Sequence, residues 1–124
     1  MQMQSIFNQK LLAFARDLQN LNASLTNPIH QIGLLENGIQ LTAALDSSAP
    51  VRLFREHVSV PYGAHILNKD EKFFLEETSD LSAHHQSSMN LIDMLRSVWK
   101  TLSKEDREAI FDHMILLIKI EKKI

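Results

Sequence analysis

The sequence predicts an all-α fold, an irregular helical bundle of about five to six helices, two of them short, in a single domain over residues 1–124. Three observations support it. Apolar residues recur every three or four positions over long stretches, which is the spacing of one helical face. Only 3 Gly and 3 Pro occur, fewer than a turn-rich β-sandwich needs. The short β-compatible runs VRLF and HVSV lie beside helix-start signals.

The first helix is predicted from about Ser5 to Leu21. Its apolar residues alternate in steps of four and three and therefore share one face. We interpret this segment as an amphipathic helix that covers the core of its own chain. A coiled-coil strip for a partner is the alternative, but the pattern is short. The apolar face consists of Phe7, Leu11, Phe14, Leu18 and Leu21.

Asn27 and Pro28 predict the start of a second helix, because Asn is a good N-cap and proline suits the first turn. Gly33 and Gly38 each weaken such a helix by about 1 kcal/mol relative to Ala, and close helix–helix contact is one reason to tolerate them. The apolar residues occupy two sides, which predicts a central helix. They are Ile29, Ile32, Leu34, Leu35, Ile39, Leu41 and Leu45.

A third helix start is predicted at Ser47 or Ser48, with Pro50 in the first turn and a short helix through about His57.

Pro61 predicts a break in the helix after about His57. Val60 is expected to be extended because it precedes Pro61, which can begin another short helix. Asp70 could then cap one more turn that carries Phe73 and Phe74.

The C-terminal part begins with the least apolar run of the chain, residues 78–90, which we predict to be an exposed polar loop. A helical stripe follows from Leu91 to Leu102. Ser103 predicts the N-cap of a last helix over about 104–122, with Asp106 at the third position of a capping box.

Too much of the circumference of this last helix is apolar for a surface helix. It is therefore predicted to be either central or shared with a neighbouring chain. On the second alternative, the candidate interface consists of Trp99, Phe111, Met114, Leu117 and Ile118.

Charge and composition bear on partners and location. The net charge is −2, and acids outnumber bases by seven to four in residues 46–80. Nucleic-acid binding is disfavoured, because no basic stripe follows from this distribution. The chain has no Cys, which removes disulfides and thiolate zinc sites. The N-terminus does not resemble a signal peptide, and the densest apolar run is far shorter than the roughly 20 residues of a membrane span. We therefore expect a soluble protein that is not secreted.

Six histidines raise the question of a metal site. No two of them are four residues apart, which is the spacing of paired helical zinc ligands. No glycine elbow surrounds a serine, and no phosphate-binding glycine loop occurs. We therefore predict no cofactor, no metal and no enzymatic activity. An enzyme that uses His57, His65 and Asp70 is the least favoured alternative.

The stretch of residues 53–77 is interpreted as a structural corner. Its aromatic groups each contribute roughly 1.5–3 kcal/mol when fully buried. Proline sets a bend, and tyrosine can bury its ring while its hydroxyl bonds to the backbone. The predicted corner residues are Phe54, His57, Pro61, Tyr62, Asp70, Phe73 and Phe74.

Three stretches in order, FARDL (14–18), FREHVSVPYGAHILNKDEKFFLE (54–76) and VWKTLSKEDREAIFDHMILLIKI (98–120), resemble a family of small helical proteins of large double-stranded DNA viruses of algae and protists. Members share an F-x-E-x-V-x-x-P-Y run before a polar loop and a closing helix pair. Phe111 and His113 stand where the family often has Trp and Tyr, and residues 22–48 match only in their apolar pattern. The family has no assigned activity, so no catalytic residue is carried over.

The resemblance implies a viral product. We expect a non-enzymatic structural or protein–protein interaction protein, with a minor capsid-associated component of the virion as the preferred role. Its partners would be copies of itself, in a homo-oligomer, or other viral proteins. The alternative is an infected-cell factor that binds a host or viral protein, including one that acts on nucleic acid. The expected location is the virion or the host cytoplasm.

Overall fold

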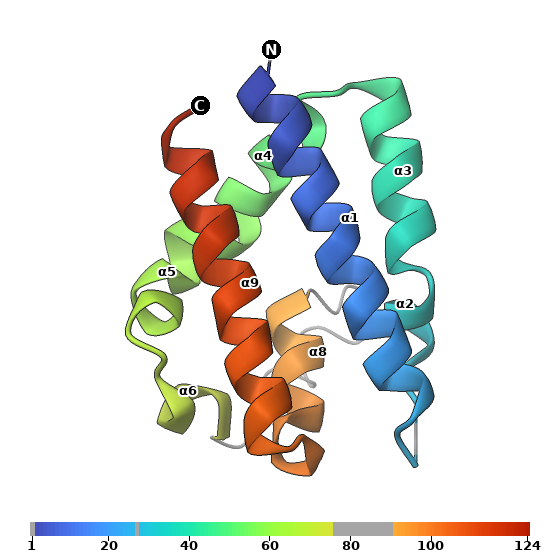
Figure 1. Cartoon of the computed structure of the whole chain (residues 1–124), viewed down its shortest axis with the longest axis vertical. Coiled ribbons are helices and arrows are strands. Elements are labelled where there is room, and N and C mark those ends of the chain that lie inside the picture. Colours follow the sequence, from blue (N-terminus) through green and yellow to red (C-terminus); the bar gives the residue numbers. More distant parts are fainter. Residues whose placement is uncertain (1, 27, 76–90) are drawn as a thin grey trace.

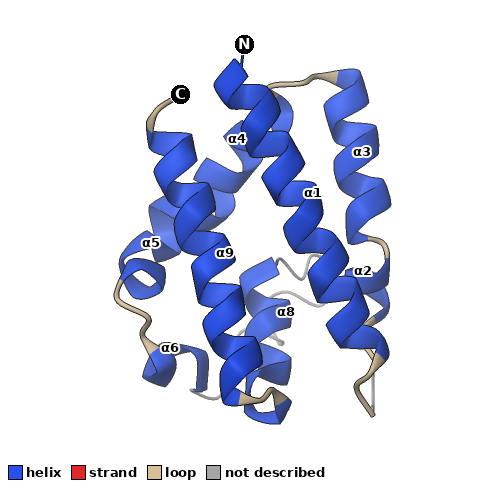
Figure 2. Cartoon of the chain, viewed as in Figure 1, coloured by secondary structure: helices blue, strands red, loops and turns tan. Residues whose placement is uncertain are grey.

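The computed structural model describes residues 2–26, 28–75 and 91–124, and the fold is all-α, as predicted. Among these residues, five helices have seven residues or more and no strand occurs. The long helices α1 (Gln2–Ala23) and α9 (Lys104–Lys122) pack side by side, and α3 (Leu35–Leu45) lies beside α1 at the edge of the bundle (Figures 1 and 2).

Shorter segments complete the described part of the bundle. They are α2 (His30–Gly33), α4 (Ala49–Phe54), the π-helical segment η1 (Arg55–Ser59), α5 (Val60–Leu67), α6 (Glu71–Leu75), α8 (Leu91–Val98) and the 3₁₀ turn η2 (Trp99–Thr101). The predicted polar loop at 78–90 lies outside the described residues. None of the described helices is both long enough and apolar enough to span a bilayer.

The first helix is confirmed and is slightly longer at both ends than predicted. The predicted apolar face is buried, and Leu21 at its end is half-buried. Helix α1 packs against α9 and also against α2, α3 and α4, and Phe7 of its apolar face contacts Phe54 of α4.

The predicted second helix is wrong in its start and its continuity. It begins at His30 with Ile29 at the N-cap, so Pro28 lies before the first turn. The chain then leaves helical geometry at Leu34, where φ is −98° and ψ is 0°, and α3 begins at the next residue. Asn27 lies outside the described residues.

The central position predicted for this segment is also wrong. Ile32 is buried, but α3 has no fully buried residue. Leu41 and Leu45 are 64% and 81% exposed. A Cβ added at Gly33 or Gly38 would meet no atom of the described residues within 4 Å, so these glycines do not serve a close contact between the described helices. An apolar pattern shows which face is suited to burial, but not whether another element covers it.

The third helix start is confirmed at Ser48, with Pro50 in the first turn, but the cap differs from the prediction. The carboxylate of Asp46 accepts hydrogen bonds from the Ser48 N–H at 3.0 Å and from the Ser48 hydroxyl at 2.7 Å. The expected break at Pro61 is wrong, because Val60 is helical with φ −66° and ψ −52°. The π-helical segment immediately before it widens the helix, and a wide turn accommodates a proline that cannot donate a hydrogen bond.

The last helix has the predicted bounds and is central. The hydroxyl oxygen of Ser103 accepts a hydrogen bond from the Asp106 N–H at 3.1 Å, as the capping prediction requires. The five residues predicted as an interface between chains are buried in the core of this chain, so that prediction is corrected. They are Trp99, Phe111, Met114, Leu117 and Ile118. Their burial accounts for the wide apolar circumference without a second chain.

Candidate functional site

The predicted corner is partly assembled, around a residue that the prediction did not include. The imidazole of His65 stacks on Phe73, with ring centroids 4.1 Å apart. Its Nδ1 lies 2.9 Å from Oδ2 of Asp70. Tyr62 contacts the same phenylalanine at 5.5 Å between centroids, and Phe74 lies behind it in the core.

The turn after α5 brings Asp70 to His65. Lys69 has a left-handed backbone with φ 49°. Its N–H donates to Ile66 O at 3.0 Å, and the Asp70 N–H donates to His65 O at 2.9 Å. These two bonds form a Schellman motif, which usually has glycine at the left-handed position. The Lys69 ammonium bonds Glu108 at 2.8 Å, so α9 helps to hold this conformation.

The other predicted corner residues lie elsewhere. Phe54 packs against Phe7 at 5.4 Å between ring centroids, away from the corner. His57 and Pro61 are exposed. The three residues of the enzyme alternative are therefore not all brought together, since His57 does not join the His65–Asp70 pair. In the described part of the chain, no three His, Asp or Glu side chains are grouped so that they could hold a metal ion.

The corner makes one pH-dependent contribution to stability. Hydrogen bonds from His65 and then from the Phe73 N–H lower the pKa of Asp70 below its ordinary value of 3.8. Because the folded-state pKa is the lower one, this stabilisation is fully present above the unfolded-state pKa and is lost as the pH falls through the folded-state pKa.

We expect Asp70→Asn to be less stable than the wild type at pH 7, with a difference that shrinks towards pH 2. Asn still provides an oxygen that can cap α6, so the variant removes the ionisable group rather than the cap. Thermal unfolding at several pH values measures the difference. Glu105→Gln, an exposed carboxyl at the start of α9, is the control. An Asp70→Asn difference that does not change with pH would contradict this account.

A histidine next to a carboxylate is also the arrangement of a catalytic general base. In the described residues, no serine or threonine hydroxyl bonds to His65, and one face of its ring is covered by Phe73. The observed contacts make this pair a clamp that fastens α5 to α6.

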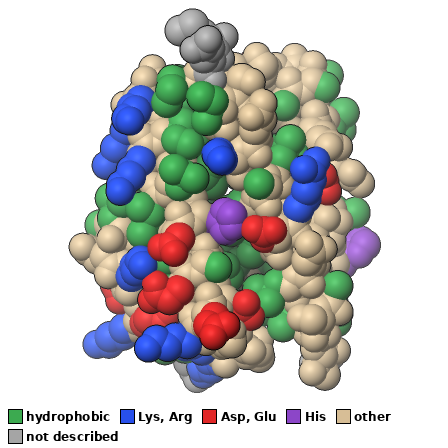
Figure 3. Space-filling view, viewed as in Figure 1, with side chains coloured by type: hydrophobic (Ala, Val, Ile, Leu, Met, Phe, Trp, Pro, Cys, Tyr) green, Lys and Arg blue, Asp and Glu red, His purple; other side chains and the backbone are tan. Residues whose placement is uncertain are grey.

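A second His–Asp pair joins α9 to α1. Nε2 of His113 lies 2.8 Å from Oδ2 of Asp17, and the imidazole stacks on Phe14 at 5.1 Å between centroids. The pair borders a cavity of about 380 Å³, with Leu18 and Ile110 in its lining. On the face where α1 and α9 lie in front, Figure 3 shows a histidine and acidic side chains beside this hollow. Sequence reasoning missed the pair because its members are 96 positions apart.

A second cavity, of about 400 Å³, is an apolar groove between α3 and the continuous helix α4–η1. On the α3 side it is lined by Leu35, Ile39 and Thr42, and on the other side by Leu53 and Phe54. Among the described residues, the lining contains one titratable side chain, His57, and no Asp, Glu, Lys or Arg. The groove is therefore suited to an apolar surface rather than to a charged ligand.

The exposed side of α3 extends this apolar surface. Leu34, Leu41 and Leu45 share one stripe, at spacings of seven and four, and all three are exposed. We call this stripe the leucine ridge. The single charged residue of α3, Glu36, forms an ion pair with Arg16 of α1. A helix that faces water usually carries charges on its outer side, whereas interface cores are depleted of them.

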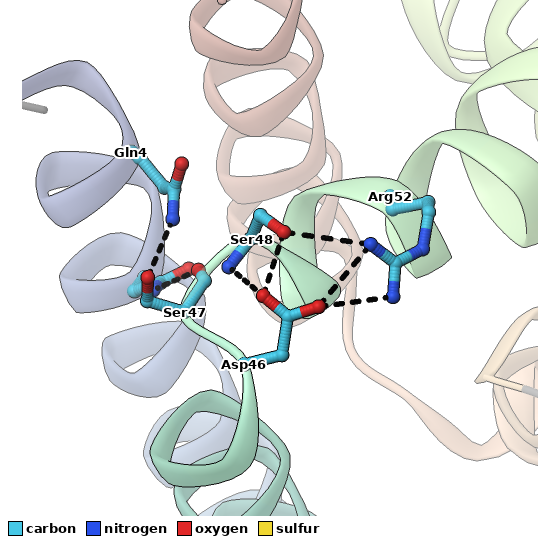
Figure 4. Close-up of polar contacts among 6 residues, drawn as sticks. Gln4, Asp46, Ser47, Ser48 and Arg52 are labelled. Carbon is cyan, nitrogen blue, oxygen red and sulfur yellow. Dashed lines mark hydrogen bonds and ion pairs between the residues drawn. The ribbon is translucent and has the colours of Figure 1, made fainter.

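A polar network fixes one end of the groove (Figure 4). The amide of Gln4 donates to the Ser47 hydroxyl at 2.9 Å, which ties the α3–α4 connection to α1. Asp46 accepts from Ser48 and pairs with Arg52 at 3.4 Å. The hydroxyl and N–H of Ser48 are the main causes that lower the pKa of Asp46. The network therefore ties the connection between α3 and α4 to α1 and to the first turns of α4.

Comparisons with models of protein families, with curated proteins and with solved structures found no significant match.

Proposed function

We propose that this protein is a non-enzymatic protein–protein interaction module that binds an apolar helix in the groove between α3 and α4–η1. The observation that carries this proposal is the exposed apolar face formed by the leucine ridge and the groove, whose described lining contains no Asp, Glu, Lys or Arg. Contiguous exposed apolar surface of this kind typically marks a site of protein interaction.

The energetics favour a partner that covers this face. Each leucine contributes roughly 1.5–3 kcal/mol when it is fully buried. Leu41 and Leu45 are exposed in the single chain, so a partner that buries them would gain this free energy on binding. A groove between two helices accepts a third amphipathic helix, whose apolar residues repeat every three or four positions. The chain already supplies the two flanking helices, and the polar network at Asp46 holds their connection.

The resemblance to viral proteins supports a place for this module in a virus particle. We propose that it is a minor structural component of the virion of a large DNA virus, where it contacts other protein subunits. Quantitative mass spectrometry of purified particles tests this setting. A copy number that scales with the capsid proteins supports it, and absence from the particle with abundance in infected cells contradicts it.

A photo-reactive amino acid at Asn37, which is exposed on α3 and shares the face of Leu34 and Leu41, tests the interaction itself. In cells that make the protein, we expect a discrete adduct with one protein species, and the double substitution Leu41→Glu and Leu45→Glu should abolish it. The same probe at Lys119, on α9, is the matched control and should not give this adduct. An adduct that survives the double substitution, or that forms equally from Lys119, would rule out the α3 face.

A further inference from the structure

We infer that the occupant of the groove is a second copy of this chain. This inference rests on the function proposed above and names its partner. In a two-fold symmetric dimer, the leucine ridge of each copy packs into the groove of the other. Helix α3 then lies against the α3 of the partner copy, and both grooves are filled by one contact.

The shape of the face supports a symmetric contact. A two-fold interface uses the same patch on both subunits, so the patch must be complementary to itself. Here a projection and a hollow lie side by side on one face: the leucine ridge stands next to the groove, and Leu34 belongs to both. One copy can therefore offer its ridge while it accepts the ridge of the other.

The charge distribution supports the same partner. Near the axis of a two-fold interface each charge faces its own image, so a charged patch would repel itself. The described part of the face avoids this cost, because Glu36 is paired with Arg16 and the described lining of the groove contains His57 but no Asp, Glu, Lys or Arg. The exposed polar residues of α3, such as Asn37 and Gln40, are neutral. In the described lining only the imidazole of His57 can carry a charge, so a partner selected by several ionic contacts has little there to pair with.

Gly38 supports close approach of the second copy. It lies in the wall of the groove, and a Cβ added there would meet no atom of the described part of the chain within 4 Å. Glycine allows an approaching backbone or a large side chain to come nearer than any other residue would. Its presence within a helix, where it is otherwise unfavourable, is then explained by contact with another chain rather than with this one.

Sedimentation equilibrium of the whole chain over about 1–500 μM is the first test. We expect the wild type to be a dimer, and Leu41→Glu with Leu45→Glu to weaken dimerisation about 100-fold or more. Both leucines are exposed in the single chain, so the fold should be kept, which circular dichroism checks. Leu116→Glu is the control, because Leu116 is 41% exposed but lies on α9.

Disulfide trapping locates the contact. The chain has no Cys, so one introduced cysteine reports a single position. In a scan along α3, we expect Asn37→Cys or Ala44→Cys, which flank the leucine ridge, to form a disulfide dimer on oxidation, since symmetric contacts bring identical residues together near the axis. Lys119→Cys on α9 should remain monomeric under the same conditions.

The outcomes separate this inference from the function on which it rests. If the wild type stays monomeric to 500 μM while the probe at Asn37 captures a different protein, the inference of a second copy is overturned and the proposed interaction function is kept. A dimer that the glutamate variant does not weaken overturns the proposed geometry. Failure of both the dimer and the α3-dependent adduct overturns both proposals.

Discussion

Phe111→Ala is expected to lower the free energy of unfolding by about 3–5 kcal/mol, the usual cost of deleting a large aromatic side chain from a core. Phe111 is fully buried on α9. Its ring contacts Trp99 at 5.2 Å and Phe74 at 5.4 Å between centroids, and those two rings stack on each other at 4.4 Å. The substitution therefore removes one member of a cluster that joins three segments and leaves a cavity between the other two.

Urea denaturation followed by circular dichroism measures this loss. Since a small domain has about 5–15 kcal/mol of total stability, the variant should show a large shift of the midpoint or be partly unfolded without urea. Leu116→Ala on the same helix is the matched control, with an expected cost of about 1 kcal/mol or less because this side chain is partly exposed. Equal losses for the two variants would contradict the central position of α9.

Asn22→Asp is expected to cost about 2–3 kcal/mol at pH 7, although it changes only one amide to a carboxylate. Asn22 is buried. Its Nδ2 donates to Ile29 O at 2.9 Å, and its Oδ1 accepts from the Ile29 N–H at 2.8 Å. A carboxylate keeps the second bond but cannot make the first, and its charge lies against a carbonyl oxygen in a poorly solvated place. Because Ile29 is the N-cap of α2, this clamp also sets where the chain turns towards α3.

The effect of Asn22→Asp should depend on pH. A protonated carboxyl can donate to Ile29 O again, so the cost relative to the wild type should shrink as the pH falls from 7 towards 3. The difference is taken at each pH, because Asp46 and Asp70 make the wild type itself less stable in acid. Asn20→Asp, at an exposed position on the same helix, is the control and should cost little at either pH. If the two variants behave alike, Ile29 is not held by this clamp.

The two long helices could be predicted because their signals are local. The apolar face of α1 and the Ser103 cap of α9 each depend on residues close together in the sequence, and both were correct. The effect of each proline on its helix was harder to predict. Pro50 lies in a first turn, as predicted. The same reasoning failed at Pro61, because the π-helical segment before it accommodates a residue that has no backbone N–H to donate.

The corner and the two His–Asp pairs were only partly predictable. Asp70 was predicted as a cap, but its pairing with His65 depends on a left-handed Lys69, and the sequence signal for that conformation is normally glycine. His113 meets Asp17 only because α1 and α9 pack together, so no pattern within either helix indicates the contact.

By itself, the sequence determined the helical class and which faces are apolar, because spacing, caps and helix breakers act over a few residues. Only the tertiary structure decided which of those faces are covered. The wide apolar surface of α9 is filled by Trp99, Phe74 and other groups of the same chain, whereas the similar surface of α3 is left partly open. The physical reason is that burial depends on which elements pack together, and the same apolar pattern suits a core and an interface equally well.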